Sequence, residues 1–284
     1  MTAIVLGSVS ALLFGAMTVL VRMAIVTGVP PAAGTFLTIA PACALTGITA
    51  AARGNWDVAG AWPYVLAGLL APGIAQILFT FAVRDAGASR TSVTVGTAPL
   101  FAVATALIFL DEPLVAGLIF GAALIVTGGI VLASDRARPE HFKRIGLVYA
   151  LVGTIVFATR DTVIRWLGTE AATDVEPGVA AFVAMLTGAT VSLVFLAWTR
   201  TPLSRRAAIA FVPAGVCYGL SYVFLFEAFA RGRVSVVSPI VATEALWGVT
   251  LSWLVLRKTE QIGVRLFAGA ALVVAGGVLI GIYR

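Results

Sequence analysis

Long apolar runs alternate with short polar stretches along almost the whole chain. A helix needs roughly 20 mainly apolar residues to cross a hydrocarbon layer of about 30 Å. Ten runs of about this length are present, with bounds at 3–26, 30–52, 61–83, 88–110, 114–134, 145–168, 177–199, 207–230, 233–256 and 262–283. The pattern predicts an all-α polytopic membrane protein with ten transmembrane helices.

The composition points to the same class of protein. Of the 284 residues, 60% are hydrophobic and 11% are charged, whereas an ordinary soluble protein has roughly 25% charged residues. A water-soluble domain of this size has too much surface for its volume to hide so many apolar side chains. The composition therefore excludes disorder, a coiled coil and a soluble globule, and it makes the lipid bilayer a predicted partner.

The longest polar stretch, SDRARPEHFK, lies at the midpoint of the chain. It divides the sequence into a predicted first five-helix repeat at 1–134, a linker loop at 135–144 and a second five-helix repeat at 145–284. The halves match in order at a nearly constant offset. GAALIVTGGIVL from Gly121 corresponds to GAALVVAGGVLI from Gly269, with seven of twelve positions identical. We interpret this as a duplication, although apolar, glycine-rich helices also resemble one another by composition alone.

Each half contains five predicted spans, which is an odd number. The second half must then insert in the opposite orientation to the first. Such inverted repeats are typical of secondary transporters, whose substrate site lies near the middle of the membrane between the halves. The sequence therefore predicts two inverted five-helix repeats around a central cavity.

The net charge of +6 does not indicate nucleic acid as a partner, because the basic residues stand singly or in small groups between apolar runs. Thirteen Lys and Arg fall on the side of the membrane opposite to the termini, and five fall on the side of the termini. Cytoplasmic loops carry the excess of Lys and Arg. The count therefore predicts that both termini lie outside the cytoplasm.

The sequence offers no set of metal ligands or catalytic groups. Cys43 and Cys217 lie far apart inside apolar runs and are interpreted as buried thiols, and His141 is the single histidine. No catalytic triad, metal cluster or phosphate-binding loop is present. We therefore expect neither a metal nor a cofactor, and we do not expect an enzyme.

Several short motifs follow one another in the order found in a known family. They are ASRTSV at Ala88–Val93, TAPLFA at Thr97–Ala102, Asp111-Glu112-Pro113 before the fifth span and RGRVSVVSPIVATEALW at Arg231–Trp247. With the repeated glycine helices, they make nearly the whole chain resemble the EamA-like exporters of the drug/metabolite transporter superfamily. The chain departs from the family at Ala245, where a proline is usual. The resemblance implies export, or in some cases uptake, of small polar metabolites such as amino acids, and it implies termini in the cytoplasm, against the charge count.

Ionisable residues inside spans are the first candidates for a binding site, because charge is costly in a bilayer. Glu244 lies near the middle of its span, without a basic residue three or four positions away. Arg160 lies near the middle of the sixth span, and Asp161 points about 100° away from it around the helix. We hypothesise that Arg160 and Glu244 meet across the cavity, as a buried structural pair or as partners for the two charges of a zwitterion. Asp161 is a further candidate, although Arg165 is placed to neutralise it on the same helix face.

Aromatic and amide side chains complete the predicted substrate-binding site, and several occupy corresponding positions of the two halves. They are Gln76, Phe79, Phe101, Tyr218, Tyr222, Trp247, Phe14 and Phe157. Aromatic walls suit a substrate with an apolar or aromatic side chain, but such residues also pack helices or face lipid. Glu227 and Arg231, four residues apart near the end of the eighth span, are interpreted mainly as a structural pair.

Prolines and glycines mark positions where the spans can bend. The predicted hinges are Pro72, Gly73, Pro99, Pro213 and Pro239. Bending there suits the rocking of helices in alternating access, and static kinks are an equal alternative. These features together predict a monomeric secondary transporter in the inner (plasma) membrane of the cell that exports amino acids or similar small molecules without a cofactor. The alternatives are a carrier for another metabolite or drug class, a channel-like membrane protein and a membrane enzyme.

Overall fold

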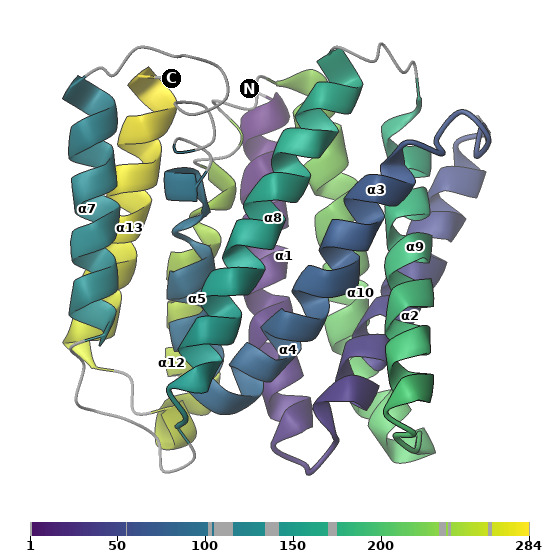
Figure 1. Cartoon of the computed structure of the whole chain (residues 1–284), viewed down its shortest axis with the longest axis horizontal. Coiled ribbons are helices and arrows are strands. Elements are labelled where there is room, and N and C mark those ends of the chain that lie inside the picture. The colour runs from purple at the N-terminus through teal and green to yellow at the C-terminus, as the bar shows by residue number, and fades with distance from the viewer. Residues whose placement is uncertain are drawn as a thin grey trace.

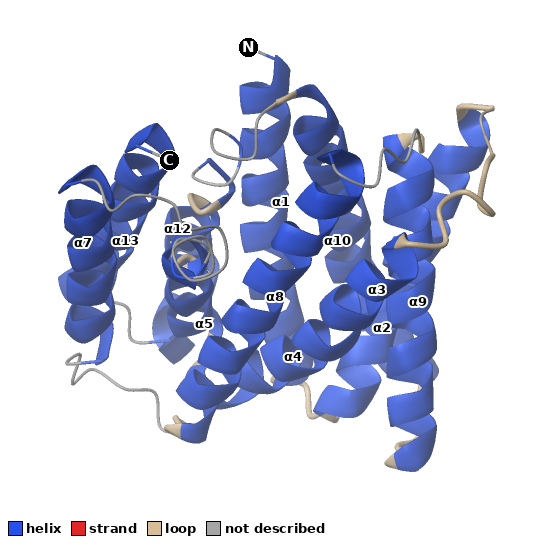
Figure 2. Cartoon of the chain, turned by 45° about the horizontal axis from the view of Figure 1, so that its top comes forward, coloured by secondary structure: helices blue, strands red, loops and turns tan. Residues whose placement is uncertain are grey.

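The computed structural model describes residues 2–54, 56–101, 104, 116–133, 142–169, 175–232, 237, 240–260 and 263–283. Within these residues the regular structure is entirely helical, with no strand. The helices stand side by side as a bundle, and both termini lie at the same end of it (Figures 1 and 2). The prediction of an all-α protein is therefore confirmed.

The helices follow one another through short connections. Their bounds are α1 (Thr2–Ile25), α2 (Pro31–Ala52), α3 (Tyr64–Gly68), η1 (Leu69–Ile74), α4 (Ala75–Ala86), α5 (Ala88–Val95), α7 (Ala116–Ala133), α8 (Ile145–Thr169), α9 (Pro177–Trp198), α10 (Arg205–Arg231), α12 (Glu244–Glu260) and α13 (Val264–Tyr283). Seven segments of the described chain are long and apolar enough to cross a membrane, namely α1, α2, the continuous α3–η1–α4 segment, α8, α9, α10 and α13. Since α7 and α12 contain shorter apolar stretches, the total of ten spans stays a prediction.

The helices pack in a pattern that recurs within the bundle. α1 lies against α10, and α8 lies against α4. In the same way α2 contacts α10 while α9 contacts α3 and η1, and α1 contacts α12 while α8 contacts α5. Three more pairs join counterparts of the two predicted halves: α2 with α9, α5 with α12, and α7 with α13. The helices α1, α2, α3–η1–α4, α5 and α7 of the first predicted half thus correspond to α8, α9, α10, α12 and α13 of the second. Each contact above has a counterpart in which every helix is replaced by the corresponding one.

The helices α7 and α13 form a close pair at one side of the bundle (Figure 1). A Cβ atom on Gly121 would lie 2.8 Å from the carbonyl oxygen of Gly276, and one on Gly276 would lie 2.5 Å from the carbonyl oxygen of Gly121. Only glycine fits at both positions without a shift of backbone. Small residues at such interfaces allow the close packing that holds helices together in lipid, so the repeated glycines have a packing role.

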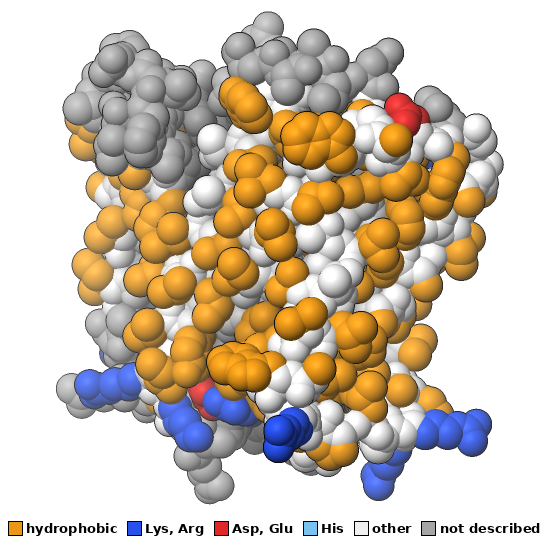
Figure 3. Space-filling view, turned by 45° about the vertical axis from the view of Figure 1, so that its right-hand side comes forward, with side chains coloured by type: hydrophobic (Ala, Val, Ile, Leu, Met, Phe, Trp, Pro, Cys, Tyr) orange, Lys and Arg blue, Asp and Glu red, His pale blue; other side chains and the backbone are white. Residues whose placement is uncertain are grey.

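Charge divides unequally between the two ends of the bundle. Lys and Arg side chains gather at the end opposite to the termini, and apolar side chains cover most of the surface between the ends (Figure 3). This basic end contains the last turn of α4 with Arg84, the segment before α8 with Lys143, and the α9–α10 connection with Arg200. On the face that Figure 3 shows, the described Lys and Arg side chains lie at the end to which the sequence-based count assigns most of them.

The third predicted span is not a regular helix. Ala71, inside the π-helical turn η1, has a φ of −147° and a ψ of 125°, which breaks the helical course. Pro72 follows it and cannot donate a helix hydrogen bond. The ring of Pro72 packs against α9 at Gly188, where a Cβ atom would lie 2.3 Å from it. The predicted hinge at Pro72 and Gly73 thus coincides with irregular backbone.

The other predicted hinges differ in their setting. Pro213 lies inside α10, and Pro41, which was not among the predicted hinges, lies inside α2. Pro99 is buried beyond the end of α5 and faces Gly277 of α13. Pro239 lies outside the described residues. That the helices bend at these prolines during transport stays a prediction.

Candidate functional site

Five aromatic side chains from α1, α4, α8 and α10 contact one another in the interior of the bundle. The ring centroid of Phe14 lies 5.7 Å from that of Phe79, 6.0 Å from that of Phe157 and 5.7 Å from that of Tyr218. Phe79 also contacts Phe157, and Tyr218 contacts Tyr222. All five side chains are buried, and their edge-to-face contacts are a favoured arrangement of rings. The fold thus brings together five of the predicted site residues.

Arg160 of α8 borders these rings and is itself buried. Its Nε atom lies 2.9 Å from Oδ1 of Asp161, and its Nη1 atom donates a hydrogen bond of 2.9 Å to the hydroxyl of Tyr222. The guanidinium also stands over the rings of Phe157 and Tyr222, whose faces attract cations. The prediction that Asp161 points away from Arg160 is wrong, because the long arginine side chain reaches its neighbour along the helix surface. The side chain of Arg165 lies outside the described part of the chain.

Glu244 is 6% exposed and lies in the first turn of α12, so it does not stand in the middle of a continuous helix. Among the described residues, no hydrogen bond or ion pair engages its carboxylate. It interacts electrostatically with Arg160, Asp161 and Tyr218 at longer range. Arg160 and Glu244 therefore lie in one region, but Arg160 forms its ion pair with Asp161. We call the five rings, Arg160, Asp161 and Glu244 the central cluster.

The helix break before Glu244 has a counterpart in the first half. The apolar pattern predicts unbroken helices over 88–110 and 233–256, whereas the structure has a turn at Thr97 and another at Thr243. Each threonine hydroxyl donates a hydrogen bond of 2.6 Å to the carbonyl oxygen three residues before it. The two turns correspond at the offset of 146 between the halves. The turn at Thr243 places Glu244 of the central cluster at the start of α12.

The three remaining predicted site residues have different surroundings. Gln76 is fully buried one turn before Phe79, and its Oε1 atom accepts no hydrogen bond. Its amide lies 4.0 Å from the sulfur of Met17 on α1. Phe101 is half-buried beyond α5. Trp247 is 40% exposed and packs against α1 at Gly15, rather than among the five rings.

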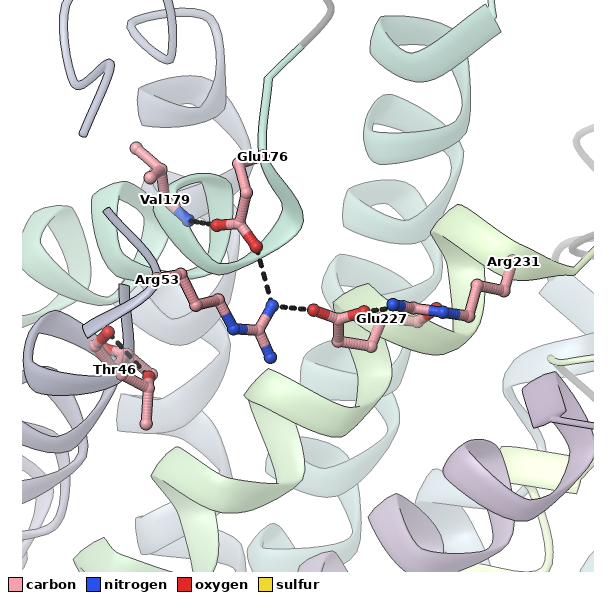
Figure 4. Close-up of polar contacts among 7 residues, drawn as sticks. Thr46, Arg53, Glu176, Val179, Glu227 and Arg231 are labelled. Carbon is pink, nitrogen blue, oxygen red and sulfur yellow. Dashed lines mark hydrogen bonds and ion pairs between the residues drawn. The ribbon is translucent and has the colours of Figure 1, made fainter. Parts of the chain in front are cut away.

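A second group of charged side chains, of which only Glu227 is buried, lies where α2, α9 and α10 meet at the end of the bundle that holds the termini (Figures 1 and 4). Glu227 forms ion pairs with Arg53 and with Arg231. Arg53 also pairs with Glu176 at 2.6 Å, and Glu176 caps α9 by accepting a hydrogen bond from the N–H of Val179. The predicted pair of Glu227 and Arg231 is confirmed. We call Arg53, Glu176, Glu227 and Arg231 the end network.

The sequence indicates the end network only in part. The spacing of Glu227 and Arg231 reveals one pair, and the position of Glu176 directly before Pro177 is typical of a helix cap. No local pattern identifies Arg53, because its two partners lie 123 and 174 residues away in the chain. Such contacts depend on how distant helices meet.

An all-helical chain with several segments able to cross a membrane and charge buried between them is a multi-pass membrane protein. The model of the EamA-like transporter family matches residues 1–134 and 144–282. The chain therefore belongs to the EamA-like transporter family and is a membrane transporter of the drug/metabolite type.

One solved structure, named only "Crystal structure of protein", is similar to the chain with a TM-score of 0.64 at 20% identity. The similarity covers 95% of this chain and 96% of the other. At this level of identity it concerns the fold alone. No curated protein gives a significant match.

Proposed function

We propose that the protein is a secondary transporter that exports amino acids or similar small polar metabolites across the inner membrane by alternating access. The observation that carries the proposal is the central cluster, in which three ionisable side chains meet five aromatic rings between α1, α4, α8, α10 and α12. Charge inside a membrane protein is costly and is typical of substrate or ion sites. In this proposal the rings enclose the apolar body of the substrate, and the charged groups bind its polar end.

A pair of inverted five-helix repeats, 1–134 and 145–284, supports alternating access. The recurring helix contacts and the matching turns at Thr97 and Thr243 are in keeping with such a repeat. α1 starts at the end with the termini, whereas its counterpart α8 starts at the opposite end (Figure 1). In an inverted repeat the halves exchange conformations, and the site between them opens to each side in turn. The irregular backbone at Pro72 would take part in this change.

The binding site would use both halves of the protein. Phe14, Gln76 and Phe79 would come from the first, with Phe101 as a further wall residue. The second half would contribute Phe157, Arg160, Asp161, Tyr218, Tyr222, Glu244 and Trp247. The basic end of the bundle would face the cytoplasm. A reporter fused to the C-terminus tests this orientation, since activity of the reporter inside the cytoplasm would contradict it.

Counterflow in proteoliposomes tests the proposal. We expect saturable exchange of a labelled amino acid, and unlabelled amino acids should compete with it. In Arg160→Ala and in Glu244→Ala the exchange rate should fall about tenfold or more. Flux that rises linearly with concentration, without competition, would indicate a pore. Unchanged exchange in both variants would place the substrate outside the central cluster. The same assay with an imposed pH gradient measures proton coupling.

A further inference from the structure

The charges of the central cluster do not balance. The inference drawn from this imbalance rests on the carrier of the proposed function and narrows its substrate class from amino acids to amines. With Glu244 ionised, Arg160, Asp161 and Glu244 carry one positive and two negative charges. Arg160 already has a carboxylate partner in Asp161 at 2.9 Å, and its Nη1 atom is engaged by Tyr222. Glu244 forms no ion pair among the residues that the structure describes, although Arg160 acts on it at longer range.

The other groups of the site also favour a positive charge. Oε1 of Gln76, next to Phe79, is a buried acceptor without a donor. The rings of Phe157 and Tyr222 already attract the guanidinium of Arg160, and aromatic faces attract an ammonium group in the same way. A buried carboxylate with no partner is costly, and a cation beside it removes that cost. Oε1 of Gln76 and Oδ1 of Asp161 are thus buried acceptors without a hydrogen bond that a cationic ligand would satisfy, while Nε of Arg160 and the hydroxyl of Tyr218 also lack a hydrogen bond.

A carboxylate on the substrate would meet the opposite situation. To bind Arg160 it would have to displace Asp161 or approach while Asp161 and Glu244 are both close by, and like charges repel strongly where water is excluded. We propose that the site selects organic monocations, namely an ammonium group on an apolar or aromatic body, over the zwitterionic amino acid with the same body. Glu244 is the residue that sets this preference.

Pairs of compounds that differ only by one carboxylate test the selectivity. Phenethylamine is compared with phenylalanine, and tyramine with tyrosine, by titration calorimetry on the full-length protein in detergent. We expect each amine to bind about tenfold or more tightly than its amino acid. In Glu244→Gln this ratio should fall to within about threefold. Glu227→Gln is the matched control, because it makes the same change at a buried glutamate of the end network, and it should keep the wild-type ratio.

Equal or tighter binding of the amino acids by the wild-type protein would overturn the selectivity, as would an unchanged ratio in Glu244→Gln. If that variant does not fold, the wild-type ratio decides alone. Counterflow of the same compounds separates the two proposals. If amino acids bind best and exchange saturably, the proposed carrier is supported and the cation preference is rejected. If amines bind best but show no counterflow, the cation-selective site is supported and the proposed carrier is rejected.

Discussion

The central cluster and the end network each contain a buried glutamate between apolar helices, but only the end network balances its charges. There, the carboxylates of Glu176 and Glu227 face the guanidiniums of Arg53 and Arg231. The central cluster has two carboxylates and one guanidinium, which pairs with Asp161, and Glu244 has no ion pair within the described chain. In a balanced group the charges neutralise one another and the ion pairs join helices. A charge without an ion-pair partner is available to a ligand.

The two groups also differ in how the backbone supports them. The end network lies at helix ends, where Glu176 caps α9 and Arg231 stands in the last turn of α10. Negative charge at a helix start and positive charge at a helix end are favourable because of the helix dipole. Arg160 lies inside α8 and has no such help, so its surroundings of rings and Asp161 must compensate for its burial. Glu244 does have this support, since it stands in the first turn of α12, so the contrast in local support concerns Arg160 alone.

The largest effect is expected from Arg160→Met, which leaves Asp161 and Glu244 without their cation. Removing one partner of a buried ion pair costs about 3–5 kcal/mol, so the midpoint of thermal unfolding in detergent should fall strongly. Counterflow of a labelled amino acid should fall to background, because the central cluster then holds no cation for its carboxylate. A variant with wild-type stability and exchange would show that the central cluster is neither a packed ion pair nor a binding site.

A double variant separates the two roles of Arg160. In Arg160→Met with Asp161→Asn the pair is removed as a whole, and stability should return to within about 1 kcal/mol of the wild type. Exchange should remain lost. Recovery of exchange would mean that Arg160 serves only to neutralise Asp161.

A smaller effect on stability and exchange is expected from Glu227→Gln. This variant gives the end network an excess of positive charge, so that its charges no longer balance. Arg53 and Arg231 would lose their shared carboxylate, but both are exposed enough to turn toward water. We expect a loss of about 1–3 kcal/mol in thermal unfolding. The half-saturating concentration in counterflow should stay within about threefold of the wild type. Lost exchange with unchanged stability would place the end network in the transport cycle and end the distinction between the two groups.

Much of the fold could be predicted from the apolar pattern, because the thickness of a bilayer limits the length of each span directly. The predicted bounds 3–26 and 177–199 lie within one residue of α1 (Thr2–Ile25) and α9 (Pro177–Trp198). The break at Thr243 was not predicted, because the residues around it, apart from Glu244, are as apolar or small as those of a helix interior. Hydrophobicity reports where a chain lies in the membrane and not whether its backbone stays helical there.

The candidate site could be predicted only as a list of residues. Charge within a span singled out Arg160, Asp161 and Glu244 for a physical reason that needs no structure. Their pairing depended on side-chain length and on the angle between α8 and α12, which the sequence does not contain. For the same reason Trp247 was placed in the site by symmetry, whereas in the structure it packs against α1 with much of its ring exposed.

The smallest effect is expected from Arg53→Ala, and a double-mutant cycle makes it informative. The side chain of Arg53 is 39% exposed, so water and salt screen its interactions, and each ion pair should contribute about 1 kcal/mol or less. Its coupling to Glu227, 5% exposed, should exceed its coupling to Glu176, 17% exposed, because burial weakens screening. Thermal unfolding of the single and double alanine variants at low and high salt measures both couplings, and only the coupling to Glu176 should disappear in high salt. If high salt removes both couplings, the ion pairs of the end network behave like surface ion pairs. The end network would then differ from the central cluster in solvent exposure and not in charge balance.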